Sequence, residues 1–244
     1  MKILVTGFDP FGGESVNPAI EAVKRLPDEI LGMEIIKQEI PTVRWKALDR
    51  IEEAVKKYDP DVILSVGQAG GRADISVERI GINVDDFRIP DNEGNQPVDE
   101  IIDPQGPDAY FLNLPIKKIV DRIKKYQIPA SVSNTAGTFV CNHVAYGTRR
   151  MMELRYPGKR SGFIHIPFLP QQVAEKKAVA SMSLEVIVQG LTAALEAIAD
   201  FVSPEYSEAI KRTKDLAAGA VLIIAIAAAI VGGIIFFPKL IALC

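Results

Sequence analysis

Residues 61–66 read DVILSV, a short apolar run that stops at Gly67. A run of this length, rich in β-branched side chains and closed by a glycine, is typical of a strand that is buried on both faces. Residues 43–58 precede it and predict an amphipathic helix, whose apolar stripe consists of Ala47, Leu48, Ile51 and Val55. A helix followed by a fully buried strand is the repeating unit of α/β proteins, so these two segments decide the fold class.

The same alternation continues on both sides of this unit. The patterns of apolar, glycine and proline residues predict further strands at residues 2–6, 33–40, 75–84, 130–133 and 162–166. They predict further helices at residues 17–25, 114–126, 139–155 and 184–199. Residues 91–107, rich in Pro, Asp and Asn, predict a long irregular loop. The sequence therefore predicts an α/β fold around a largely parallel sheet.

The composition of the 244 residues excludes several classes of protein. Hydrophobic residues make up 48% and charged residues 24%, so the chain can bury a core and is not a disordered segment. The net charge of −3 gives no basic surface for nucleic acid. Cys141 and Cys244 are the only cysteines, which excludes a disulfide framework and a zinc finger and indicates a reducing compartment. The apolar run at residues 2–6 is too short for a cleaved secretory signal.

The last part of the chain differs in character from the rest. Residues 217–237 are 21 residues without a charge. As a helix they would span about 31 Å, the thickness of a bilayer core. Basic residues flank this stretch unequally, with Lys211, Arg212 and Lys214 before it and Lys239 after it. Because the more basic flank stays inside, we expect a membrane helix that tethers the N-terminal domain to the cytoplasmic face of the membrane. The alternative is a helix buried in a protein core.

Cys141 is the candidate nucleophile. It lies in AGTFVCNH (residues 136–143), where a glycine-containing loop enters a predicted helix. Unpaired amides and the positive end of the helix dipole lower the pKa of a thiol at such a place, and they can also bind an oxyanion. The alternative is a small buried cysteine without reactivity.

A cysteine nucleophile needs a base, and the chain contains two histidines. His165 ends a predicted strand in GFIHIPF (residues 162–168), and strand ends of an open α/β sheet line the ligand crevice. His143 follows Cys141 by two residues on one helix, and such side chains point away from each other. We therefore expect His165 to be the base and His143 to be a surface or packing residue.

The base in turn needs a group that orients it, and Glu78 is the candidate. It lies in DISVERIGIN (residues 74–83) among extended apolar residues. The alternative is a carboxylate on the solvated face of an edge strand, and composition does not distinguish the two.

Two glycine-rich segments follow predicted strands without completing a nucleotide-binding motif. The first is GFDPFGG (residues 7–13), which Glu14 follows. Gly13 and Glu14 stand where a phosphate-binding loop requires Lys and then Ser or Thr. GQAGGRAD (residues 67–74) lacks the three-glycine spacing of a dinucleotide site. The aromatic residues of the first segment indicate either the apolar wall of a pocket or ordinary core packing.

Four stretches of the sequence together resemble the family of pyroglutamyl-peptidase I (pyrrolidone-carboxylate peptidase). They are TGFDPFGGESVNP (residues 6–18), GQAGGRADISVERIGIN (67–83), RIPDNEGNQP (88–97), and SNTAGTFVCNH (133–143) with SGFIHIPFLPQQ (161–172). The resemblance covers residue 2 to about residue 197. It implies a three-layer α/β sandwich of the phosphorylase/hydrolase type, with a mostly parallel, twisted sheet.

The resemblance also implies roles for residues. Cys141 would be the nucleophile, His165 the base and then the acid, and Glu78 the residue that orients and charges His165. The pocket for the pyroglutamyl ring would be formed by Phe8, Phe11, Thr42, Ile89, Phe139 and Val140. The backbone of Gln68 would pair with the lactam, and Arg88 would lie near the nucleophile.

The implied activity is that of a cysteine exopeptidase. Peptides with an N-terminal pyroglutamyl (5-oxoprolyl) residue would be cleaved through a thioester, without a metal or a cofactor. Relatives often form dimers or tetramers, so we expect a homo-oligomer. The alternative from another class is a catalytically silent, membrane-tethered scaffold or partner-binding protein with the same fold.

The tail resembles a second family. Residues 194–237 are similar to the C-terminal part of small prokaryotic diacylglycerol or undecaprenol kinases, and the matching charged residues are Glu196, Asp200, Lys214 and Asp215. Gln189 and Thr192 stand where those kinases have a catalytic Glu and an Asn, so we expect no kinase activity. A natural fusion, an engineered chimera and an assembly error all remain open.

Together the two resemblances predict three parts of the chain. Residues 1–199 form the catalytic domain, residues 200–215 form an amphipathic linker helix, and residues 216–244 form a membrane helix with a short tail.

Overall fold

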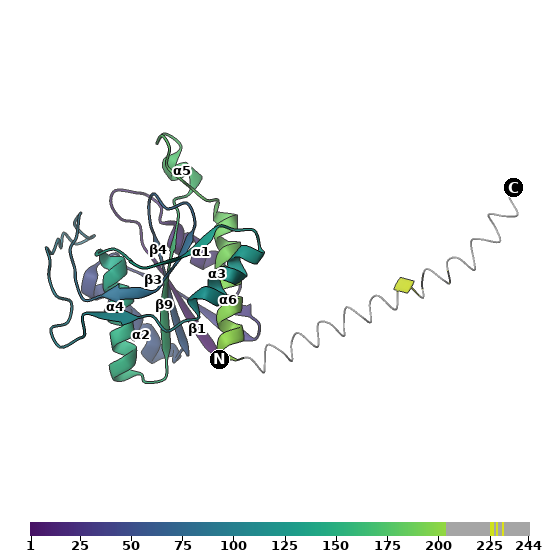
Figure 1. Ribbon diagram of the computed structural model, residues 1–244, viewed down its shortest axis with the longest axis horizontal. Coiled ribbons are helices and arrows are strands. Elements are labelled where there is room, and N and C mark those ends of the chain that lie inside the picture. The colour runs from purple at the N-terminus through teal and green to yellow at the C-terminus, as the bar shows by residue number, and fades with distance from the viewer. Residues whose placement is uncertain (204–224, 227, 229–230, 232–244) are drawn as a thin grey trace, which may run out of the picture. The chain divides into compact units, whose positions relative to one another are not determined.

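The computed structural model describes residues 1–203, 225–226, 228 and 231 (Figure 1). The chain divides into two compact units, Met1–Phe201 and Val202–Cys244. The first unit contains every predicted site residue.

A sheet of seven strands forms the centre of this unit. In spatial order the strands are β2 (Glu29–Ile30), β3 (Met33–Ile40), β1 (Lys2–Phe8), β4 (Val62–Gln68), β9 (Arg160–Ile166), β5 (Ile75–Glu78) and β8 (Ala130–Ser133). A separate pair consists of β6 (Ile80–Ile82) and β7 (Ala109–Phe111). The central strands β1 and β4 are almost completely buried, as the apolar run at residues 61–66 predicts.

Helices cover both faces of the sheet. They are α1 (Pro18–Arg25), α2 (Arg44–Tyr58), α3 (Ile116–Lys125), α4 (Val140–Arg155), the short α5 (Pro170–Val173) and α6 (Leu184–Val202). Figure 1 shows α2 and α4 on one side of the sheet and α1, α3 and α6 on the other. This arrangement is a three-layer α/β/α sandwich, which confirms the predicted fold class.

The sheet is mixed but largely parallel, as predicted: four of its six strand pairings are parallel, among them β5 with β8, and two are antiparallel. β1 runs parallel to β3 and β4, and β4 runs parallel to β9, but β5 runs antiparallel to β9, and β2 runs antiparallel to β3. The reversal of β5 has a physical reason. Residues 69–74 alone connect β4 to β5, and a parallel return needs a crossover of a dozen residues or more.

The predicted elements are present, with a few differences. Residues 75–84 form two short strands instead of one, because the chain leaves the large sheet after Glu78 and pairs with β7. Gly81 packs directly on α4, where an added Cβ would lie 2.7 Å from the backbone nitrogen of Tyr146. The elements β2, β7 and α5 were not predicted, since two to four residues carry no detectable periodicity.

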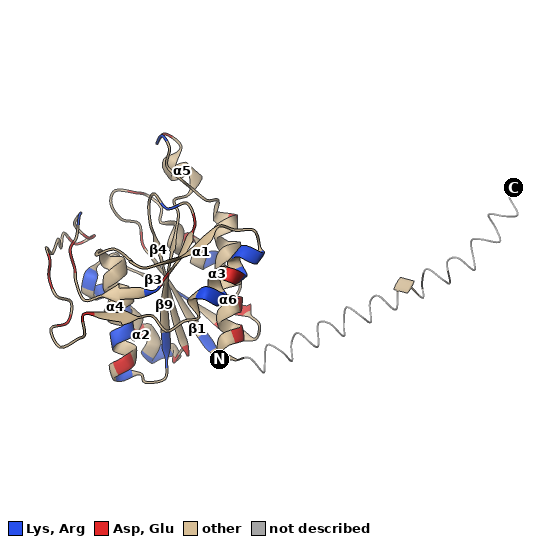
Figure 2. Ribbon diagram, in the orientation of Figure 1, with Lys and Arg blue, Asp and Glu red and all other residues tan. Residues whose placement is uncertain are grey.

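Charged residues of both signs are interspersed along the helices (Figure 2). Between α3 and α6, Arg122 donates to Glu196 at 3.0 Å and also to Asp200. Glu196 and Asp200 are the two described residues that match the kinase family. Within this fold their carboxylates bind α6 to α3.

The predicted membrane span, residues 217–237, lies outside the described residues except for positions 225, 226, 228 and 231. Among the described residues, no helix combines the length and the apolar character needed to cross a membrane. Most of the predicted linker helix, residues 200–215, also lies outside them.

Candidate active site

Cys141 lies in the first turn of α4, as predicted. Phe139 precedes this helix and makes no capping hydrogen bond through its side chain, so no side chain caps the first amides of the helix. The thiol is half-buried. Burial raises the pKa of Cys141 to about 12, the negative charge of Glu78 adds to this rise, and Arg72 opposes it. This upward shift is the opposite of what a helix start alone predicts; it favours the thiol over the thiolate, so Cys141 needs a base in order to react.

His165 near the end of β9 is bound to Glu78. Nδ1 of His165 lies 2.7 Å from Oε1 of Glu78. An ionised carboxylate can only accept, so Nδ1 carries the proton and Nε2 is the atom that can take up another. Burial lowers the pKa of His165 below its ordinary value, and Glu78 opposes this shift. A neutral imidazole is the form that a general base requires.

Glu78 ends β5, and its side chain is completely buried. Burial by itself would raise its pKa, but the hydrogen bond and charge of His165, helped by Ser133 and Arg72, hold the pKa of Glu78 below its ordinary value. Because β5 lies between β9 and β8, the alternative of a solvated edge strand is wrong. A buried carboxylate that stays ionised orients the imidazole and stabilises its protonated form.

The sheet register explains why these side chains meet. His165 of β9 pairs with Gly67 of β4 on one side and with Ser76 of β5 on the other. Side chains alternate between the two faces of a strand, so Glu78 lies on the same face of β5 as Ser76. Since β5 is antiparallel to β9, the chain reaches Glu78 without a crossover helix.

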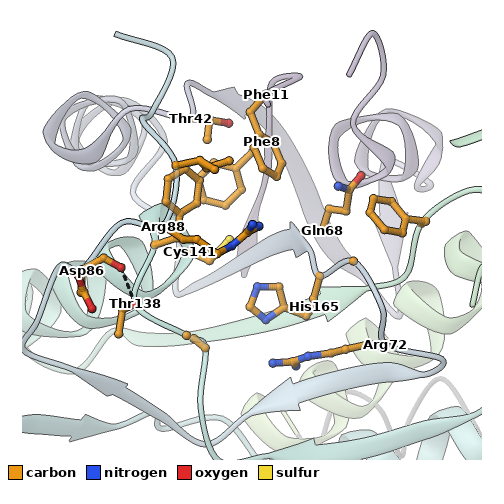
Figure 3. A pocket seen from close by; sticks show the side chains of 17 residues that line it. Phe8, Phe11, Thr42, Gln68, Arg72, Asp86, Arg88, Thr138, Cys141 and His165 are labelled. Carbon is orange, nitrogen blue, oxygen red and sulfur yellow. Dashed lines mark hydrogen bonds between the residues drawn. The ribbon is translucent and has the colours of Figure 1, made fainter. Parts of the chain in front are cut away.

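Cys141 and His165 both line a cavity of about 660 Å³ (Figure 3). Most of the predicted pocket residues line it as well: Phe8, Phe11, Thr42, Gln68, Arg88, Ile89 and Phe139. Val140 does not line it, because its side chain is completely buried in the core against α2. Glu78 is also absent from the cavity wall and contacts it only through His165 and Arg72.

One wall of the cavity is aromatic. The ring of Phe139 lies 5.9 Å from that of Phe11 and 4.7 Å from that of Phe87, between ring centres. The aromatic residues of the GFDPFGG segment therefore form a pocket wall, one of the two interpretations left open by the sequence. At the other side, Gln68 accepts a hydrogen bond from Gln172 at 2.9 Å, so its side-chain amide is already engaged.

The segment after Ile89 is fixed by a buried carboxylate. Asp91 accepts hydrogen bonds from the backbone amide of Asn95 at 2.9 Å and from that of Arg44 at 3.1 Å. Asp9 accepts from the amide of Thr42 at 2.6 Å. These contacts attach the irregular loop to the start of α2 and so hold one rim of the cavity.

His143 lies away from the cavity, as the two-residue spacing predicts. Its side chain is completely buried, and Nδ1 lies 2.8 Å from Oδ2 of Asp85. The ring of Trp45 packs edge-on against it at 4.6 Å. His143 is thus a packing residue, and the alternative of a surface residue is wrong.

Several residues that line the cavity were not predicted, and they include Arg72, Asp86, Thr138 and Phe168. Arg72 belongs to the glycine-rich segment that follows β4, and the position after a strand end was a usable signal. Nothing in the sequence marks Asp86 or Phe168, because folding alone brings their loops together. Among the described residues, no group of three or more His, Cys, Asp or Glu side chains is arranged to hold a metal ion.

Comparison with protein families gives two matches. The family model of pyroglutamyl peptidase, Peptidase_C15, matches residues 1–201. The family model of prokaryotic diacylglycerol kinase matches residues 167–236 and overlaps the first match across α5 and α6.

Curated relatives agree with the first match. The pyrrolidone-carboxylate peptidase of Finegoldia magna is 64% identical over 200 residues, which is 82% of this chain and 94% of the relative. The pyrrolidone-carboxylate peptidase of Treponema denticola is 64% identical over 202 residues, which is 81% of this chain and 93% of the relative.

Solved structures agree as well. The crystal structure of pyroglutamyl peptidase I from Bacillus amyloliquefaciens has a TM-score of 0.79 and 52% identity, covering 81% of this chain and 94% of that one. A mutant pyrrolidone carboxyl peptidase from Pyrococcus furiosus has a TM-score of 0.80 and 40% identity, covering 83% of this chain and 100% of that one. With this fold, this cavity and these relatives, the chain belongs to the pyroglutamyl peptidase family of cysteine peptidases.

Proposed function

We propose that this chain removes the N-terminal pyroglutamyl residue from peptides, with Cys141 as nucleophile, His165 as base and then acid, and Glu78 as the group that orients His165. The contact between Nδ1 of His165 and Oε1 of Glu78, at the wall of the cavity that Cys141 lines, carries this proposal. Membership of the pyroglutamyl peptidase family supports the choice of substrate.

The first step joins the substrate to the enzyme. Nε2 of His165 takes the proton of the Cys141 thiol as sulfur attacks the carbonyl carbon that follows the pyroglutamyl ring. A proton transfer that accompanies attack fits a thiol whose pKa is raised to about 12. The amides at the start of α4 face no capping side chain and are suited to stabilise the oxyanion of the tetrahedral intermediate.

The second step releases the products. The imidazolium of His165 gives its proton to the leaving amine, the C–N bond breaks, and a thioester with Cys141 remains. Water then attacks the thioester, with His165 again as base, and pyroglutamate leaves. Glu78 remains ionised through both steps and balances the charge on the ring.

The cavity suits a small, neutral ring. Phe11 and Phe139 offer an apolar wall for the ring methylenes, and the backbone near Gln68 offers polar partners for the lactam. A substrate without the lactam would leave those polar groups unpaired, and such a mismatch discriminates more strongly than shape. The volume of about 660 Å³ exceeds that of one ring and leaves room for the next residue.

A fluorogenic pyroglutamyl amide tests this proposal. The purified chain should release the fluorophore, iodoacetamide should stop the release, and the matching prolyl amide, which lacks the lactam carbonyl, should not be cleaved. A folded chain that hydrolyses neither amide would instead support the catalytically silent scaffold.

We also propose that residues 217–237 tether the enzyme to the inner face of the cytoplasmic membrane. The uncharged stretch and its uneven basic flanks support this proposal. Membranes from cells that express the full chain should retain it through carbonate extraction. Release as a single soluble species would contradict the tether.

For the assembly state we propose a dimer or a tetramer. Val98, Ile101 and Phe111 are the most exposed of the large apolar side chains in the described part of the chain, which supports an interface between copies. Light scattering of the chain after chromatography should give a mass of two or four copies, and a monomer would contradict the proposal.

A further inference from the structure

Glu78 has a partner besides the neutral His165, and this partner is a cation. Nη1 of Arg72 lies 2.6 Å from Oε1 of Glu78, the same oxygen that accepts the hydrogen bond from His165. Glu78 is completely buried, and only 28% of the Arg72 side chain is exposed. Hydrogen bonds between ionised partners that are removed from water are the strong ones, because little solvent screens them.

Arg72 also joins two walls of the cavity. Its Nη2 donates to the backbone carbonyl of Thr135 at 3.0 Å, which ties the loop after β4 to the loop before α4. The backbone turns sharply before it, with Gly71 at a φ of +87°. In Figure 3 the imidazole of His165 is drawn between the Cys141 side chain and the Arg72 guanidinium. The planar guanidinium can make both contacts at once, which a lysine ammonium of similar reach does less well.

Few charged residues surround the base. The charged residues in the cavity wall are Arg72, Asp86 and Arg88, and behind the wall lies Glu78. Of these, only Arg72 forms an ion pair with Glu78 among the described residues. In its absence the buried carboxylate would keep only neutral partners, the His165 imidazole and the Ser133 hydroxyl, and a buried charge without a charged partner is costly.

The neighbouring arginine, Arg79, does not contact Glu78. It follows Glu78 directly in the chain, yet its Nε donates to Oδ1 of Asn134 at 2.7 Å and not to Glu78. The two arginines therefore bind the same neighbouring loop, but only Arg72 contacts the catalytic carboxylate.

We propose that Arg72 is a positioning residue that keeps Glu78 ionised and oriented toward His165. This inference rests on the proposed function, in which Glu78 acts through His165. The positive charge of Arg72 also favours deprotonation of its neighbours, because it lowers the pKa of Cys141 and of His165. Removal of that charge should therefore raise the pKa of both Cys141 and His165.

The test compares Arg72→Gln, Arg72→Lys and the matched control Arg79→Gln in the full-length chain. The kcat and KM for pyroglutamyl-7-amido-4-methylcoumarin are measured from pH 5 to pH 10. The rate at which iodoacetamide alkylates Cys141 is followed by mass spectrometry over the same range, and thermal melting reports on folding.

We expect R72Q to lower kcat at least about tenfold, to shift the acid limb of the pH profile upward by about one unit, and to slow the alkylation of Cys141 about tenfold at each pH. KM should change less than about twofold, since the pyroglutamyl ring of the substrate does not bind through Glu78. R72K keeps the charge and should retain the wild-type pH limbs, and R79Q should match the wild type in every measurement.

Two results would overturn the proposal: pH limbs in R72Q that coincide with the wild type, or an R72K profile shifted as far as that of R72Q. If R72Q does not fold, R72K decides, since an acid limb of R72K that moves upward would contradict a role based on charge. A wild-type chain that hydrolyses nothing would refute the proposed function instead, and the alkylation rates of the variants would still test Arg72.

Discussion

Gly67 of β4 lies against Cys141, the proposed nucleophile, so closely that a Cβ on Gly67 would lie 2.9 Å from Sγ of Cys141. The same Cβ would also lie 2.9 Å from the ring of Phe163. The missing side chain of Gly67 is therefore the space in which the thiol sits, and this explains why a glycine ends the apolar run at residues 61–66.

We expect Gly67→Ala to reduce kcat about 10²-fold, because a displacement of the nucleophile by less than 1 Å disturbs attack. The crowding should cost about 1–3 kcal/mol of stability. Gly162→Ala is the matched control. Gly162 lies in β9 of the same sheet and does not line the cavity, and a Cβ added there would lie 2.3 Å from the Leu114 side chain. The control should lose stability and keep its kcat, and equal kcat losses in both variants would contradict the assignment.

Cys141→Ser should lower turnover at least about 10³-fold, because a hydroxyl with its higher pKa replaces the attacking sulfur. Thermal melting should show the fold unchanged. Cys244→Ser leaves the cavity untouched and should keep wild-type turnover. A Cys141→Ser variant with wild-type rates would show that the nucleophile is another group.

The two histidines should separate activity from stability. We expect His165→Ala to cost at least about 10² in kcat, the usual contribution of a general base. His143→Ala should leave kcat nearly unchanged but destabilise the fold by about 1–3 kcal/mol, since the buried Asp85 loses its hydrogen bond to His143 and keeps only the ion pair with Arg44 at 3.4 Å. Kinetics and denaturant melts on both variants check this, and the reverse pattern would exchange their roles.

Asp91 should make the stability of the chain depend on acid pH. Burial would raise its pKa, but hydrogen bonds from Asn95, Arg44 and Glu93 hold the pKa of Asp91 below its ordinary 3.8. A lowered pKa in the folded state means that this stabilisation is complete above the unfolded value and is lost as pH falls through the folded value.

Denaturant melts of the wild type and Asp91→Asn should therefore differ by about 1–3 kcal/mol at pH 6, and the difference should shrink below pH 4. Asp99 is exposed in the same loop, so Asp99→Asn serves as the control and should match the wild type at both pH values. A wild-type advantage over Asp91→Asn that stays constant with pH would contradict the ionic role.

Truncation should show where the enzyme ends. The chain cut after Ser203 retains all described contacts of α6 and should have full activity. A cut after Ala199 removes Asp200, which pairs with Arg122, and Phe201, whose ring lies 4.8 Å from the Arg160 guanidinium. This shorter chain should be about 1–2 kcal/mol less stable with the same kcat. Loss of activity in the chain cut after Ser203 would show that the tail takes part in catalysis.

Most of the fold could be predicted because its long elements carry clear periodic patterns. Residues 33–40 form β3 within the predicted bounds, and residues 17–25 form α1 after Asn17, whose side chain accepts from the amide of Ala19. The direction of β5 could not be predicted, since a strand pattern reads the same whichever way the strand pairs. Only the length of the 69–74 connection carried that information.

The site was predictable where single residues have chemical character of their own. Cys141 and His165 stand at a helix start and a strand end, and the family resemblance gave Glu78 its place. The position of Arg72 after a strand end marked it only as a candidate among 28 basic residues, because no sequence pattern shows that its side chain turns back to Glu78, six residues further on. Val140 was assigned to the pocket by resemblance alone, whereas helix geometry turns its side chain into the core.

The position of β9 also bears on the order in which the site assembles during synthesis. Among the described residues β9 is the last strand, yet it fills the gap between β4 and β5 in the middle of the sheet. As the ribosome extends the chain, Cys141 and Glu78 emerge before His165, and the edges of β4 and β5 that face the gap stay unpaired until β9 follows. His165 therefore reaches Glu78 only when β9 closes the sheet, so we expect the proposed peptidase activity to appear only after this strand has been synthesised.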